Sequence, residues 1–81
     1  GPPQPSPNAG LYLRIPTMDT LEDEPVRLLL SIFDGSFPVY LRVMESGKML
    51  RAPRNLWVDP NDVLIRELGR HLGDRNVKKL L

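Results

Sequence analysis

Few residues in this 81-residue chain have the chemistry that catalysis needs. General acid–base catalysis usually uses a histidine or a pair of carboxylates, and a nucleophile needs a base beside it. The one histidine, His71, falls near the end of a predicted helix, and the chain has no cysteine. The glycines are too scattered to form a phosphate-binding loop. The sequence therefore predicts no catalytic residue, no metal site and no cofactor.

Tyrosine and arginine, in contrast, recur at alternate positions of three short predicted strands. Because neighbouring residues of a strand point to opposite faces of a sheet, one face would carry these side chains and the other would carry Leu13, Leu41 and Leu50. Aromatic rings interleaved with arginines are typical of sheets that bind single-stranded nucleic acid, and such a face can also dock a protein. An ordinary amphipathic sheet has the same pattern. The residues expected on the uncovered face are Tyr12, Arg14, Tyr40, Arg42, Met44, Met49 and Arg51.

The single tryptophan, Trp57, lies between the third predicted strand and the second predicted helix. A lone tryptophan in such a place most often packs in the core or at its rim. A partly exposed tryptophan is instead a typical anchor of a protein interface. Trp57 is therefore a candidate binding residue at the edge of the face.

Charge and hydropathy limit the class of protein. Eleven Lys and Arg residues oppose ten Asp and Glu residues, and a net charge of +1 does not by itself indicate a nucleic-acid binder. No apolar run approaches the roughly 20 residues that cross a bilayer, and the chain does not start with the basic-then-apolar order of a signal peptide. We therefore expect a cytoplasmic domain, monomeric when isolated and without a membrane contact.

The first half of the domain predicts a strand, a helix and a hairpin. Residues 11–15, 38–43 and 48–52 alternate with period two, and residues 45–47 supply a turn between the last two runs. Residues 34–36 are expected to end the helix and turn directly into the hairpin. The helix itself has apolar residues at helical spacing, namely Val26, Leu29, Leu30, Ile32 and Phe33.

The second helix has the clearest start signal. Asp59 is a suitable N-cap, Pro60 suits the first helical position, and Val58 can pack on Val63 as a hydrophobic staple. Gly73 is expected to end the helix, and residues 76–81 to form a last strand. The other expected features are a buried stripe of Leu64, Ile65, Leu68 and Leu72, and exposed pairs Asp62–Arg66 and Glu67–His71.

The order β-α-β-β-α-β predicts an α+β fold, with a four-stranded sheet and two helices on one face in a two-layer sandwich. The ferredoxin-like split βαβ arrangement is the economical solution. Residues 1–10 contain four of the nine prolines and no large apolar side chain, so we expect a disordered linker. Its first residues, Gly1 and Pro2, match the remnant of a cleaved tag. Residues 11–81 would form the single domain.

Five short motifs along residues 11–81 match those of a known family. They are residues 11–16 (LYLRIP), 35–41 (GSFPVYL), 46–48 (SGK), 52–58 (APRNLWV) and 72–77 (LGDRNV). Together they resemble the extreme C-terminal domain of bacterial DNA polymerase III alpha subunits. That family has Gly-Asp-Thr-Pro-Val before the hairpin and an acidic pair after the last helix. Here Ser36 and Phe37 replace Asp-Thr, and Arg75 interrupts the acidic pair.

The resemblance implies a non-catalytic role. The catalytic aspartates of that family lie in a distant palm domain, and none corresponds to a residue here. The C-terminal region of the family is associated with docking the tau subunit of the clamp loader, beside an oligonucleotide-binding fold that handles single-stranded template. The leading hypothesis is a docking domain that tethers a replicative polymerase to the clamp loader during DNA replication. Strand alternation, and not the family, supplies its expected binding residues: Tyr12, Arg14, Tyr40, Arg42 and Arg51, with Trp57 at the edge.

The alternative hypothesis is a small module that binds single-stranded DNA on the same face. Met49, Arg51 and Pro53 stand where such a platform would place aromatic residues on its third strand, and the net charge is near zero. Protein docking is therefore favoured over nucleic acid. An amino-acid-sensing domain of the same topology would need a glycine beside the first strand–helix turn, which this chain lacks.

Overall fold

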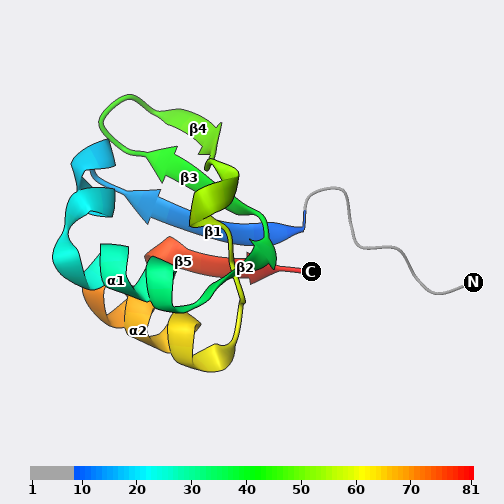
Figure 1. The fold of residues 1–81 in the computed structure, drawn as a ribbon. Coiled ribbons are helices and arrows are strands. Elements are labelled where there is room, and N and C mark those ends of the chain that lie inside the picture. Colours follow the sequence, from blue (N-terminus) through cyan, green and yellow to red (C-terminus); the bar gives the residue numbers. More distant parts are fainter. Residues whose placement is uncertain (1–8) are drawn as a thin grey trace, which may run out of the picture.

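The computed structural model describes residues 9–81 (Figure 1). Residues 1–8 of the linker predicted at residues 1–10, including the tag remnant, lie outside the described residues. The first strand begins at Gly10 and Ala9 is already buried, so the domain starts before the predicted boundary at Leu11. The elements follow in the order β1 (Gly10–Ile15), η1 (Met18–Glu22), α1 (Glu24–Ile32), β2 (Asp34–Phe37), β3 (Val39–Val43), β4 (Lys48–Arg51), η2 (Arg54–Leu56), α2 (Asp62–Leu72), η3 (Asp74–Asn76) and β5 (Val77–Leu80).

A direct parallel pairing of β1 with β3 forms the centre of a four-stranded sheet. The strand order is β4-β3-β1-β5, with β4 antiparallel to β3 and β5 antiparallel to β1. The predicted α+β class is confirmed: a mixed sheet and two helices form two layers, and the element order is compatible with a ferredoxin-like fold. The two parallel strands are immediate neighbours here, whereas a split βαβ unit has another strand between them.

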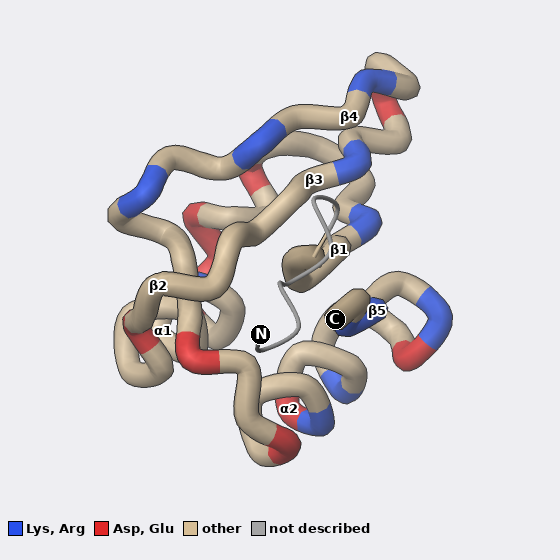
Figure 2. The backbone as a smooth tube through the Cα atoms, turned by 90° about the vertical axis from the view of Figure 1, so that its right-hand side faces the viewer, with Lys and Arg blue, Asp and Glu red and all other residues tan. Residues whose placement is uncertain are grey.

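The core lies between the sheet and the helices α1 and α2, which cover the same face (Figures 1 and 2). Leu64 and Leu68 of α2 and Leu30 of α1 are fully buried against it. Leu50 shares this face by register, but it is 39% exposed because β4 is an edge strand. The strand residues of the core are Leu11, Leu13, Ile15, Val39, Leu41 and Val43.

The predicted hairpin is confirmed as β3 and β4. Leu41 pairs with Leu50, and the turn between the strands contains Gly47 at φ 71°. Glycine adopts this left-handed conformation without the steric cost of a Cβ atom. The Gly47 amide donates to the Val43 carbonyl at 2.8 Å, which closes the turn.

Helix α1 begins as the sequence predicts but buries a narrower stripe. Asp23 is the N-cap residue and Pro25 lies in the first turn. Ile32, expected in the buried stripe, is 69% exposed. It follows the buried Leu30 by two residues, about 200° of helical rotation, which turns it away from the sheet. The buried residues of α1 are Val26 and Leu30.

The residues after α1 form a short strand, β2, where the sequence predicts only a turn. Asp34 and Phe37 both bridge to Val58, and the Gly35 amide donates to the Trp57 carbonyl at 3.1 Å. The Asp59 amide donates to the Phe33 carbonyl at 2.6 Å. This hydrogen bond connects the segment before α2 to the C-terminal end of α1.

Helix α2 begins two residues later than predicted. The N-cap is Asn61, whose side-chain oxygen accepts from the Leu64 amide at 3.0 Å. The Asp59 carbonyl accepts from the Asn61 amide at 2.8 Å, so it is engaged in a tight turn and does not start the helix. The expected staple is absent: Val63 is 46% exposed while Val58 is fully buried.

The C-terminal end of α2 agrees with the prediction better than its start does. Gly73 ends the helix as expected, at φ 96°. Within residues 9–81 the one salt bridge on this helix is Glu67–Arg70 at 3.4 Å, in place of the two pairs predicted from i, i+4 spacing. No helix of the described part has the length and apolar character needed to cross a bilayer.

Replacing Gly35 with alanine is expected to lower the free energy of unfolding by about 1–3 kcal/mol. A Cβ atom at this position would lie 2.6 Å from backbone atoms of Val58 and Asp59, which cannot move without breaking the bridge to β2. Urea denaturation followed by circular dichroism measures the loss.

Gly69→Ala is the matched control. A Cβ atom there would meet the carboxylate of Asp74, an exposed side chain that can swing away, and alanine favours a helix over glycine by about 1 kcal/mol. We expect a smaller loss than at Gly35. Equal losses at the two glycines would contradict this account of β2.

Candidate binding face

The register of the central strands gathers the predicted tyrosines and arginines on the face that the helices leave uncovered. Tyr12 pairs with Tyr40 and Arg14 with Arg42 across the parallel strands. The neighbouring strands extend this face, because Arg51 pairs with Tyr40, Met49 with Arg42 and Lys78 with Tyr12. We call this surface the open face, formed by Tyr12, Arg14, Tyr40, Arg42, Met49, Arg51 and Lys78.

The two tyrosine rings stack on each other at the middle of the open face. Their centroids are 4.9 Å apart and their planes differ by 16°. The ring of Tyr40 also lies against Gly10, where a Cβ atom would come within 2.5 Å of the ring. The absence of a side chain at Gly10 thus provides the space for the stacked pair.

Basic residues dominate the charge of the open face. Figure 2 shows Lys and Arg positions along β4, β3, β1 and β5, and none of these four strands contains Asp or Glu. Among residues 9–81 no carboxylate forms a salt bridge with a basic group of this face; the salt bridge found is Glu67–Arg70 on α2. A chain with a net charge of only +1 therefore presents one strongly basic surface.

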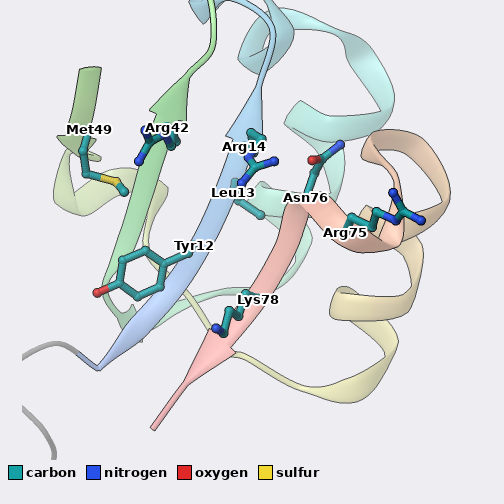
Figure 3. Close-up of a pocket in the computed structure, with 8 residues that line it drawn as sticks. All are labelled: Tyr12, Leu13, Arg14, Arg42, Met49, Arg75, Asn76 and Lys78. Atoms are coloured by element: carbon teal, nitrogen blue, oxygen red, sulfur yellow. The ribbon is translucent and has the colours of Figure 1, made fainter. Parts of the chain in front are cut away.

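A shallow pocket of about 210 Å³ lies on the open face and is lined by residues of β1, β3, β4, β5 and η3. In Figure 3, Arg14 and Arg42 project from adjacent strands, Met49 and Tyr12 lie near one side, and Arg75 and Asn76 come from η3. The Asn76 side chain donates to the Leu72 carbonyl at 2.6 Å, which fixes η3 to the end of α2. The lining contains four cationic groups and no carboxylate: Tyr12, Leu13, Arg14, Arg42, Met49, Arg75, Asn76 and Lys78.

Trp57 lies beside β4, close to two guanidinium groups. The guanidinium carbon of Arg51 is 4.7 Å from the centre of the Trp57 ring, and that of Arg54 is 5.4 Å away. The indole Nε1–H donates to the Ala52 carbonyl at 3.0 Å, so the ring is held in one orientation. We call Arg51, Arg54 and Trp57 the Trp57 corner.

The predicted binding residues thus form two groups. Tyr12, Arg14, Tyr40 and Arg42 lie together at the centre, and Arg51 links this centre to Trp57. Sequence reasoning missed the cationic residues contributed by short elements and by the last strand. Alternation in residues 76–81 would have placed Lys78 on the open face, whereas no local signal places Arg54 or Arg75 beside it.

The described residues contain no constellation typical of catalysis or metal binding. His71 lies in the last turn of α2 and is exposed. No group of three or more His, Cys, Asp or Glu residues in residues 9–81 is arranged to hold a metal ion. Comparisons with family models, curated proteins and solved structures found no match to this chain. The geometry of the open face is therefore the main guide to function.

Trp57→Phe is expected to lower the free energy of unfolding by about 0.5–1.5 kcal/mol, because the indole donor to the Ala52 carbonyl is lost while an aromatic ring remains. Thermal unfolding of the two proteins measures the difference. A variant as stable as the parent would show that this hydrogen bond does not hold the corner.

Proposed function

We propose that this chain is a non-catalytic docking domain of a replicative DNA polymerase III alpha subunit. It acts in the cytoplasm during DNA replication, needs no cofactor, and is monomeric when isolated. Its partner is a protein such as the tau subunit of the clamp loader. The resemblance of residues 11–81 to that family supports the polymerase context. The observation that carries the docking role is the Trp57 corner beside an uncovered sheet.

The Trp57 corner has the composition of an interface anchor. Tryptophan and arginine are enriched among residues that contribute most to protein–protein affinity. The indole is already oriented by its hydrogen bond to Ala52, and two guanidinium groups are already placed against it. A partner therefore meets side chains that lose little freedom on binding.

The edge strand β4 gives the partner a second means of attachment. The Ala52 amide donates to the Val39 carbonyl, and alternation along an antiparallel ladder then directs the backbone groups of Met49 and Arg51 outward. An extended segment can pair with such an edge. Met49 and Leu50 are 49% and 39% exposed and offer apolar contacts.

The charge of this region indicates the chemistry of the partner segment. Lys48, Arg51 and Arg54 are exposed around the β4 edge, and none of them forms a salt bridge within residues 9–81. An extended segment with acidic residues beside an apolar side chain complements this surface. We propose that the docking segment of the partner has this composition.

Titration of the isotope-labelled chain with tau tests the docking role. We expect saturating NMR shifts at β4 and at the Trp57 indole. Trp57→Ala is expected to weaken binding by about 30-fold, equivalent to about 2 kcal/mol, as for a central interface residue. Arg54→Ala, whose side chain is exposed, is expected to weaken binding without affecting folding.

Ile32→Ala is the matched control, because Ile32 is an exposed apolar residue on α1, away from the open face. We expect it to bind tau as the parent does. Absence of any shift with tau, or parental affinity of both Trp57→Ala and Arg54→Ala, would refute docking at this corner.

A further inference from the structure

The part of the open face around the tyrosine pair combines aromatic and cationic groups in two adjacent rows. One row crosses the sheet as Arg51, Tyr40, Tyr12 and Lys78, so the stacked rings have a cation at each end. The next row contains Met49, Arg42 and Arg14. Rings and cations are thus neighbours both along and across the strands.

The cations of this region are not neutralised by the domain itself. Arg14, Arg42, Arg75 and Lys78 surround the pocket of about 210 Å³, and no carboxylate lines it. None of the four forms a salt bridge in the described part of the chain. Arg14 and Arg42 are directly paired on neighbouring strands, where like charges repel. An anionic ligand would remove that repulsion.

We infer that this pocket and the tyrosine pair bind single-stranded nucleic acid. The guanidinium groups of Arg14 and Arg42, with Arg75 and Lys78, contact phosphodiester oxygens, and a base packs against the tyrosine pair. The pocket does not include Arg51, Arg54 or Trp57, although Met49 lines it and also lies on the β4 edge. The inference does not depend on the identity of the docking partner.

Two features favour a nucleic-acid strand over an acidic peptide as the occupant. Guanidinium forks match phosphate oxygens in two-point contacts, and three of the four cations here are arginines. The stacked rings lie within the same small area, and every nucleotide brings a flat base to place against them, whereas acidic side chains contain no ring. Bases paired inside a duplex cannot reach such a platform, so the strand must be single.

Fluorescence anisotropy with a labelled 12-nucleotide oligothymidylate tests the inference. We expect saturable binding. The logarithm of the association constant should fall with the logarithm of the salt concentration at a slope of about −3, as for four phosphate contacts on a single strand. Arg14→Gln and Arg42→Gln are each expected to weaken binding and to reduce the slope by about 0.7. Tyr12→Leu is expected to weaken binding about tenfold or more with little change in slope.

Lys78→Gln and Lys79→Gln form a matched pair. The two lysines are neighbours on β5, but Lys78 pairs with Tyr12 on the open face and Lys79 pairs with Leu11 on the opposite face. We expect the first substitution to weaken binding and the second to have no effect. An equal effect of both would show that the oligonucleotide responds only to overall charge, which would overturn the inference.

A competition experiment distinguishes an oligonucleotide from an acidic peptide as the ligand of the pocket. An unlabelled oligothymidylate is expected to displace the probe, whereas a polyglutamate peptide of equal charge is not. Equal displacement by polyglutamate would assign the pocket to an acidic peptide and overturn the inference. Trp57→Ala is expected to leave oligonucleotide binding unchanged. The tau titration and the oligonucleotide titration can therefore fail independently of each other. NMR spectra of each variant confirm that it is folded before its affinity is compared.

Discussion

The parallel register between β1 and β3 is the constraint on which the rest of the structure depends. It places Leu13 beside Leu41 under the helices and, one residue further along, Arg14 beside Arg42 on the other face. A shift by one residue would exchange the two faces, so the apolar pairs hold the register firmly. Burial of the apolar pairs therefore outweighs the repulsion between the two arginines. The grouping of tyrosines and arginines on the open face is a consequence of how the core packs.

Much of this arrangement follows from short-range sequence patterns. Alternation in residues 11–15 and 38–43 correctly divides the leucines from the tyrosines and arginines, and Gly47 marks the hairpin. These patterns are informative because strand period and turn conformation depend on neighbouring residues alone. The α+β class follows once both helices are recognised.

The features that sequence reasoning missed depend on contacts between distant residues. Asp34–Phe37 has turn composition, but it forms β2 because Val58 lies within reach of its backbone. Asp59 is as good a cap as Asn61 in isolation, yet its carbonyl accepts from the Asn61 amide in a tight turn, and the helix begins at the later residue. Arg54 and Arg75 belong to short 3₁₀ helices whose positions are set by the fold around them. Local periodicity in the sequence does not predict contacts between distant residues.

The basic residues at the two sheet edges have a consequence for self-association. Lys48 and Arg51 lie on β4, and Lys78 and Lys79 lie on β5. When two copies approach edge to edge, like charges meet before backbone hydrogen bonds can form, which discourages the sheet from continuing into a second molecule. An acidic strand meets no such barrier. Basic residues at both edges therefore disfavour edge-to-edge pairing of two copies more than they disfavour pairing with an acidic strand.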